Sequence, residues 1–232
     1  MDLPIVFISS TKEDLESYRQ AARDAALRAG FHPIMMEYFS AGGNPPFQTC
    51  MEKVKPCDVL IVIVAHRYGW IPDDQPGNMQ KSITWLECEQ ALKNGKKVIA
   101  FLIDEKCPWK EELKENYRLT QAMNDGTATP EFFQEVNSAV QQLKEFKAWL
   151  RKDRIVVQFT NEQSLGELVI HALVDWKKEH GKIVESSKAI VGTKKPLDIP
   201  FGYRDWLLHR CGNIELKGAC GRGALSFHQC RL

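Results

Sequence analysis

Three hydroxyl side chains follow the first apolar run of this 232-residue chain. Ser9, Ser10 and Thr11 come directly after Ile5–Ile8, where a strand is expected to turn into a helix. The first turn of a helix leaves backbone N–H groups unpaired, so hydroxyls at this point can help to hold a phosphate or a ribose. The same residues can equally be an ordinary helix cap, and both readings stay open.

A second group of candidate residues, Arg67-Tyr-Gly-Trp70, follows the apolar run Val59–Val64. Tyr68 and Trp70 can stack on a base or a nicotinamide ring, and Gly69 lets the backbone approach a ligand closely. Aromatic residues beside a strand end also pack into cores. The motif therefore allows either a ring-binding wall or a core contact.

Two carboxylates, Glu87 and Glu89, lie in the helix expected over Ser82–Asn94. At 100° per residue they fall on opposite flanks of the buried stripe, each about 90 to 110° from its centre. Periodicity does not choose between them, and a solvated acidic first turn, favoured by the helix dipole, is the alternative to a catalytic role. The stripe consists of Trp85, Cys88, Ala91 and Leu92.

Alternating strands and helices position these groups. Repeated β-α units with apolar strands predict a doubly wound, five-stranded parallel sheet of the α/β class. The expected strands are Ile5–Ile8, His32–Met36, Val59–Val64, Val98–Ile103 and Ile155–Phe159, and the expected helices lie near 15–29, 47–54, 82–94, 130–150 and 165–176.

Open sheets of this kind bind ligands beyond the carboxyl ends of their strands. That rule restricts the search to the loops that follow the first four strands. These loops contain Ser9–Thr11, Ala41–Pro46, His66–Trp70 and Asp104–Glu105.

Composition excludes several classes of protein. The longest apolar run is far shorter than the roughly 20 residues of a membrane span, and the N-terminus has no basic signal region, so a cytoplasmic location without membrane contact is expected. The net charge of +1 gives no general reason to expect nucleic-acid binding, and none is expected. No phosphate-cradling GxxxxGK[ST] or dinucleotide-binding GxGxxG motif occurs, which argues against ATPases and dehydrogenases.

The composition changes after His180. We expect a domain over 1–180, a linker over 181–202 and a short helical tail over 203–232. The tail contains cysteines and histidines, but their spacing matches no common zinc finger, so no metal site is expected. These residues are His209, Cys211, Cys220, His228 and Cys230.

Several of these stretches together resemble a TIR-like family, formerly of unknown function, that commonly forms the N-terminal effector domain of bacterial and animal NACHT or STAND NTPases. The similarity is clear over residues 4 to about 105 and looser to 180. It is carried by Ile5-Val-Phe-Ile-Ser-Ser-Thr-Lys-Glu-Asp-Leu15 with Arg19, Cys57-Asp-Val-Leu-Ile-Val, Arg67-Tyr-Gly-Trp70 and Ser82-Ile-Thr-x-x-Glu87-x-x-x-Ala91. The tail from Tyr203 to Leu216 is similar to the segment that leads into such NTPase domains.

The resemblance implies a flavodoxin-like or TIR-like fold and a site around Glu87. Related TIR domains and nucleoside deoxyribosyltransferases carry a glutamate four residues before an alanine, a spacing that Glu87 and Ala91 match and Glu89 does not. In NAD-cleaving TIR domains this glutamate contacts the ribose next to nicotinamide. By this resemblance Glu87 is the catalytic residue, and substrate is bound by Ser9, Ser10, Thr11, Arg67, Tyr68, Gly69, Trp70 and Ser82. A tryptophan that often stands four residues before the glutamate is Ile83 here.

The leading hypothesis is an effector domain of a cytosolic immune or antiphage protein that cleaves NAD+ to nicotinamide and ADP-ribose when clustered. NAD+ is then the substrate and no cofactor is expected; the partners are further copies of the chain and a NACHT or STAND module in cis or in trans. A carboxylate can stabilise the positive charge that develops on the sugar, and nicotinamide leaves as a neutral molecule without a general acid. The alternatives are a non-catalytic TIR-like adaptor and a nucleoside or nucleotide N-glycosidase or transferase.

Overall fold

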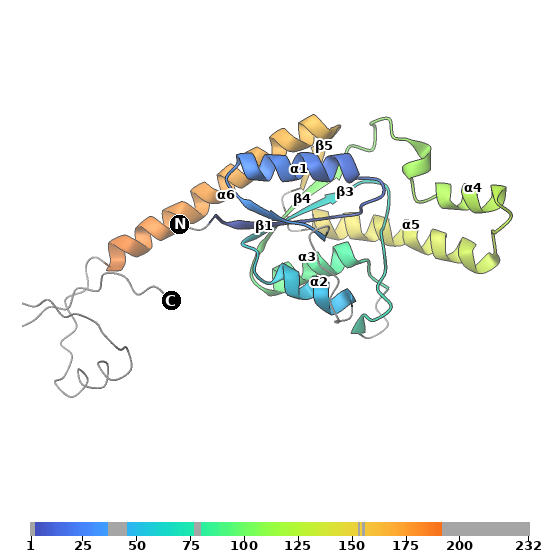
Figure 1. The fold of residues 1–232 in the computed structure, drawn as a ribbon, viewed down its shortest axis with the longest axis horizontal. Coiled ribbons are helices and arrows are strands. Elements are labelled where there is room, and N and C mark those ends of the chain that lie inside the picture. Colours follow the sequence, from blue (N-terminus) through green and yellow to red (C-terminus); the bar gives the residue numbers. More distant parts are fainter. Residues whose placement is uncertain (1–2, 37–45, 77–79, 153, 155, 192–232) are drawn as a thin grey trace, which may run out of the picture. The chain divides into compact units, whose positions relative to one another are not determined.

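The computed structural model describes residues 3–36, 46–76, 80–152, 154 and 156–191. The chain divides into two compact units, 1–176 and 177–232, and all five strands belong to the first. In chain order the elements are β1 (Ile5–Ser10), α1 (Glu16–Arg28), β2 (His32–Ile34), α2 (Pro46–Val54), β3 (Val59–Val64), α3 (Ile83–Lys93), β4 (Lys97–Ile103), η3 (Glu111–Leu113), α4 (Tyr117–Asn124), α5 (Pro130–Arg151), β5 (Val156–Phe159) and α6 (Glu162–Val191) (Figure 1).

The five strands form one parallel sheet in the order β2-β1-β3-β4-β5. This is the flavodoxin-like order, so the predicted fold class is confirmed. The order reverses between β1 and β3, which pair from Val6 opposite Val59 to Ser10 opposite Ile63. In such sheets the ligand crevice lies beyond the carboxyl ends of the two strands at the reversal. Here these ends carry Ser9–Thr11 and the loop that begins at His66.

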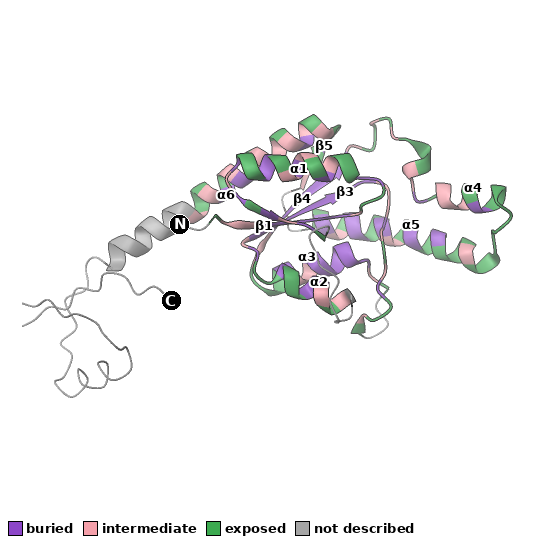
Figure 2. Cartoon of the chain, viewed as in Figure 1, coloured by how far each residue is buried: buried purple, intermediate pink, exposed green. Residues whose placement is uncertain are grey.

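Helices cover the sheet on both faces (Figure 1). Helix α1 and the first half of α6 pack on one face, and α3 and α5 pack on the other. All six residues of β3 are buried, and so are all but the first residue of β1 and of β4, as the purple of these strands in Figure 2 shows. Burial on both faces explains why the strand sequences read as continuous apolar runs rather than as alternating ones.

Helix α6 differs from the expectation at its end. It continues to Val191, whereas the sequence predicts a linker from 181. A single glycine such as Gly181 costs a helix only about 1 kcal/mol, and the first proline after it is Pro196. The expected linker therefore begins as helix; the rest of it, the tail over 203–232 and its cysteines and histidines lie outside the described residues.

The segment between β4 and α5 contains two elements that the sequence did not predict, η3 and α4. Helix α4 has eight residues and buries only Ala122, so it shows no apolar stripe. Arg118 of α4 lines the cavity described below, and two carbonyls of η3 accept hydrogen bonds from Arg67.

The helices in the described part of the chain are all too short or too polar to cross a membrane.

Candidate functional site

Glu87 lies inside the protein, on the second turn of α3. Every residue from Ile83 to Cys88 is buried, because this end of the helix packs against the sheet on one side and against α2 on the other. Glu87 is only 1% exposed, and its Oε2 accepts a hydrogen bond of 2.5 Å from the hydroxyl of Ser9. Its Oε1 has no hydrogen-bond partner among the described residues.

Glu89, the alternative carboxylate, has a different environment. It is partly exposed and forms a 2.6 Å ion pair with Lys81. The structure thus separates two residues that helical periodicity leaves equivalent: Glu87 is enclosed, and Glu89 belongs to the surface.

The environment of Glu87 changes its acidity. Burial removes water from the carboxylate and raises its pKa from 4.5 to about 7. The hydrogen bond from Ser9 and the positive charge of Arg19 act in the opposite direction, because both favour the ionised form. A carboxyl group with a pKa near neutrality is typical of functional sites, where one group must be present in both protonation states.

A cavity of about 860 Å³ lies beyond the carboxyl ends of β1 and β3. Its wall comes from the turn after β1, the loop after β3, the start of α3, the η3–α4 segment and α5. The lining residues include Ser10, Thr11, Lys12, Glu13, Arg67, Gly69, Trp70, Asp73, Ile83, Thr84, Glu115, Arg118, Glu135 and Gln142.

Glu87 and Ser9 are not part of this wall. Ile83 and Thr84, which precede Glu87 by about one helical turn, do line the cavity, and so does Ser10, the neighbour of Ser9. The carboxylate is therefore buried behind the wall of the cavity and does not reach its surface.

The three hydroxyls at the carboxyl end of β1 are already bonded within the protein. Ser9 donates to Glu87, and Ser10 donates to the carbonyl of Thr11 at 3.0 Å and accepts from Nη1 of Arg19 at 2.5 Å. Thr11 donates to the buried carboxylate of Asp14 at 2.5 Å. These contacts fix the turn and the carboxylates next to it.

The two aromatic residues of the loop after β3 have separate places. Tyr68 is 1% exposed; its hydroxyl accepts from the backbone N–H of Ser82 at 3.0 Å and donates to the carbonyl of Gln80 at 3.2 Å. Trp70 is 46% exposed and lines the cavity. Of the two expected stacking residues, Trp70 is the one exposed to the cavity, whereas Tyr68 links the loop to the start of α3. Ser82 itself is fully buried.

Gly69 joins this loop to the turn after β1. Its φ is +90°, and a Cβ at this position would lie 2.8 Å from Cγ2 of Thr11. Both the backbone conformation and the close contact require glycine. The two loops at the strand reversal therefore pack directly on each other.

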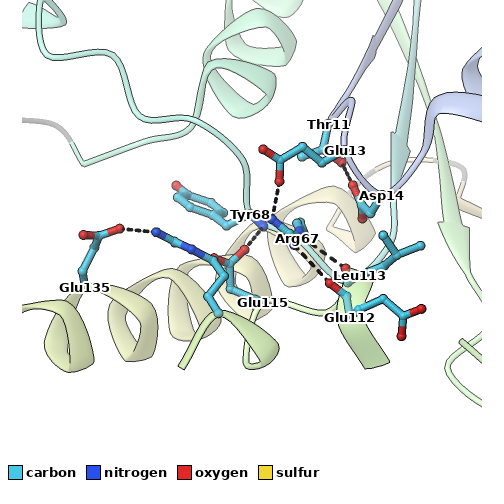
Figure 3. Close-up of polar contacts among 10 residues, drawn as sticks. Thr11, Glu13, Asp14, Arg67, Tyr68, Glu112, Leu113, Glu115 and Glu135 are labelled. Carbon is cyan, nitrogen blue, oxygen red and sulfur yellow. Dashed lines mark hydrogen bonds and ion pairs between the residues drawn. The ribbon is translucent and has the colours of Figure 1, made fainter. Parts of the chain in front are cut away.

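Arg67 is held by protein groups rather than left free for an anion. Its guanidinium donates to the carbonyls of Leu113 at 3.3 Å and Glu112 at 3.2 Å, and it forms an ion pair with Glu13 (Figure 3). Arg67 thereby ties the turn after β1 and the η3 segment to the loop after β3.

Glu115 and Arg118 complete this network and were not predicted from the sequence. Glu115 is 5% exposed, accepts from the backbone N–H of Tyr68 at 2.9 Å and pairs with Arg118 at 2.9 Å (Figure 3). Arg118 also pairs with Glu135 of α5 at 2.7 Å. The only signal in the sequence is the three-residue spacing of Glu115 and Arg118, which is common on solvated helices.

The two remaining loops named in the sequence analysis follow β2 and β4. Residues 41–45 lie outside the described residues. Glu105, after β4, pairs with Lys147 at 3.0 Å and does not line the cavity.

The fold and these contacts define a doubly wound α/β domain with a buried carboxylate at its strand reversal. A family model described as "Domain of unknown function (DUF4062)" matches residues 5–174, and the chain belongs to this family. A comparison with curated proteins gave no match.

Solved structures of similar fold include the TIR domains of the activated Roq1 resistosome directly recognizing the pathogen effector XopQ, at 13% identity and a TM-score of 0.42, over 74% of this chain and 98% of that one. Another is the CMP N-glycosidase BcmB of Clostridium botulinum, at 16% identity and a TM-score of 0.36, over 72% of this chain and 98% of that one. A third is a flavodoxin-like domain from Synechococcus sp., at 14% identity and a TM-score of 0.27, over 62% of this chain and 99% of that one. These similarities concern the arrangement of strands and helices and carry no conclusion about substrate.

Proposed function

We propose that this chain is a TIR-like effector domain that cleaves NAD+ to nicotinamide and ADP-ribose when copies are clustered, with Glu87 as the catalytic residue. The observation that supports this most strongly is the state of Glu87: a buried carboxylate at the strand reversal, with one oxygen held by Ser9 and the other without a partner among the described residues.

The proposed reaction needs one anion. The bond between the ribose C1′ and the nicotinamide nitrogen breaks, its electron pair leaves with nicotinamide, and positive charge develops on the sugar. A carboxylate held away from water stabilises this charge more than it stabilises the substrate. Water then adds to C1′ and releases one proton to solvent, which gives ADP-ribose. Glu87 has to be ionised for this step, so activity should increase as the pH rises through about 7.

The cavity and its exposed tryptophan fit a nucleotide substrate. Its volume of about 860 Å³ lies within the range of about 300 to 1,000 Å³ for small-molecule sites. In the proposed complex Trp70 stacks on a ring and the turn at Ser10 and Thr11 faces the ribose or a phosphate. Because Glu87 lies behind the wall, the wall around Ile83 has to shift before the carboxylate meets the sugar. Dependence on clustering is proposed for this reason.

The family resemblance described above supports a cytoplasmic role in immune or antiphage signalling. The proposed partners are further copies of the chain and a NACHT or STAND module, in cis or in trans.

Chromatography of NAD+ incubated with protein that is clustered through a fused oligomerisation domain tests the proposal. We expect nicotinamide release by the wild type and by Glu89→Gln, and a loss of about 100-fold or more for Glu87→Gln. Glu89→Gln is a matched control, because it removes a carboxylate from the same helix at a surface position. Circular dichroism shows whether each variant folds. Intact NAD+ with every clustered protein would refute the proposal.

A non-catalytic adaptor is the second candidate, and one observation favours it: Glu87 is enclosed and absent from the cavity wall. In that case clustering activates signalling without cleaving NAD+, and Glu87→Gln signals like the wild type.

A nucleoside or nucleotide N-glycosidase or transferase is the third candidate. The cavity wall carries three basic and four acidic residues, and two of the basic ones, Arg67 and Arg118, are paired with carboxylates. A wall without excess positive charge favours an uncharged nucleoside over an anionic nucleotide. Incubation with nucleosides and nucleoside monophosphates in the same assay distinguishes this candidate through release of the free base.

A further inference from the structure

Arg19 is a buried cation on the face of the sheet opposite Glu87. It lies on α1, is 3% exposed, and its Nη1 donates to both the carbonyl oxygen of Ser10 at 3.0 Å and the hydroxyl of Ser10 at 2.5 Å. A guanidinium is costly to bury, and bonds to oxygen atoms are what make its burial tolerable. Arg19 therefore holds the last residue of β1 through two hydrogen bonds.

Ser9 and Ser10 are consecutive in β1, and their side chains contact helices on opposite faces of the sheet, as the alternation of a strand requires. Ser10 contacts Arg19 of α1, whereas Ser9 donates its 2.5 Å hydrogen bond to Glu87 of α3. The hydrogen bonds that hold Ser10 on one face of the sheet therefore also fix the position of Ser9, which contacts the carboxylate on the other face. In this way the end of β1 connects Arg19 to Glu87.

We infer that Arg19 is a positioning residue for Glu87: by holding both oxygens of Ser10 it sets the Ser9 hydroxyl against Oε2 of the carboxylate, which leaves Oε1 for the sugar. This inference rests on the proposed function, since it assigns Arg19 a part in the same reaction. Arg19 itself touches no substrate.

The charged and titratable groups near Glu87 make the electrostatic part of this role testable. Cys50 of α2 and Cys88 of α3 lie close enough to the carboxylate to be affected by its charge. Burial, with the charge of Glu87, raises the pKa of Cys50 to about 12 and that of Cys88 well above its usual value. Both thiols stay neutral between pH 5 and 9. Arg19 is the cation whose charge lowers the pKa of Glu87.

Two variants of Arg19 separate its charge from its geometry. Arg19→Met removes both, while Arg19→Lys keeps the charge but cannot present the guanidinium fork. Arg23→Met is the matched control, because Arg23 lies one turn further along α1, is exposed and pairs with Asp24. Each variant of the full chain is clustered, and its kcat for NAD+ is measured from pH 5 to 9. The midpoint of Glu87, which is the pH at which its carboxyl group is half ionised in the folded protein, is measured separately. It follows from the pH dependence of the free energy of unfolding in urea, determined for each variant with and without Glu87→Gln.

We expect Arg19→Met to raise the midpoint of Glu87 by about one pH unit and to lower kcat on the high-pH plateau about tenfold. Arg19→Lys should keep the midpoint and lose several-fold in plateau kcat. Arg23→Met should change neither. A merely structural role of Arg19 would lower stability without moving the midpoint.

An unchanged midpoint in Arg19→Met overturns the inference, as does a plateau kcat for Arg19→Lys equal to that of the wild type. Should Arg19→Met fail to fold, Arg19→Lys decides by its plateau alone. If no protein cleaves NAD+, the proposed function fails, and the unfolding measurements still show whether Arg19 controls the ionisation of Glu87.

Discussion

The replacement Glu87→Gln should change how the stability of this protein depends on pH. The folded state raises the pKa of Glu87 from 4.5 to about 7, so the folded chain binds a proton that the unfolded chain has lost between these two values. Stability therefore falls as the pH rises from about 4.5 to about 7, and the stabilisation present at low pH is lost above it. Glutamine does not titrate, so the Glu87→Gln variant should lack this decrease in stability.

The magnitude follows from the difference between the two pKa values. A rise of the pKa of Glu87 from 4.5 to about 7 corresponds to about 3 kcal/mol over the full range, most of which falls between pH 5 and pH 8. Urea unfolding at four pH values from 5 to 8 measures this change. The free energy of unfolding of the wild type, minus that of Glu87→Gln, should decrease by about 2 to 3 kcal/mol over this range.

Glu89→Gln is the control for this measurement. Its carboxylate is partly exposed and paired with Lys81, so the replacement removes a glutamate from the same helix without altering the buried site. The free energies of unfolding of the wild type and of Glu87→Gln could instead change with pH in parallel, to within about 0.5 kcal/mol. That result would show that Glu87 ionises in the folded protein without an energetic cost, and the description of the site would be wrong.

Three further predictions concern the loop after β3. Gly69→Ala should lower the free energy of unfolding by about 1 to 3 kcal/mol, as measured in urea, because φ is +90° and the new Cβ meets Thr11. Trp70→Ala should raise KM for NAD+ about tenfold with little change in melting temperature, because the ring is half exposed on the cavity wall; an unchanged KM would remove Trp70 from the site. Tyr68→Phe should cost about 1 to 3 kcal/mol in the same urea assay, because the backbone N–H of Ser82 loses its acceptor inside the protein.

Most of the fold could be predicted from the sequence because the sheet is buried on both faces. Val59–Val64 was predicted with the same bounds that the structure shows, since a strand with no solvent-facing side has only apolar residues. The polar segment with η3 and α4 could not be predicted, because it is held by ion pairs and backbone contacts of Arg67 and Glu115 rather than by an apolar stripe.

The site was predicted only in part, for a similar reason. Helical periodicity assumes that one face of α3 is exposed, but every residue from Ile83 to Cys88 is buried, and the arithmetic leaves Glu87 and Glu89 equivalent. The family resemblance selects Glu87, and the packing of α2 and the sheet supplies the physical reason that periodicity lacks. The contact between Ser9 and Glu87 joins residues 78 positions apart, and no local pattern in the sequence encodes it.

The energetic cost of Glu87 is itself an argument about function. A buried carboxylate with one oxygen unpartnered among the described residues destabilises the folded state near neutral pH, and glutamine or an apolar residue of similar size would avoid this cost. Stability alone therefore does not explain a glutamate at this position. Where a group lowers stability and its removal also abolishes activity, the two effects together identify a functional residue. A Glu87→Gln protein that is more stable at pH 8 and no longer cleaves NAD+ would meet both conditions. A variant that is more stable and signals like the wild type would instead identify the domain as an adaptor.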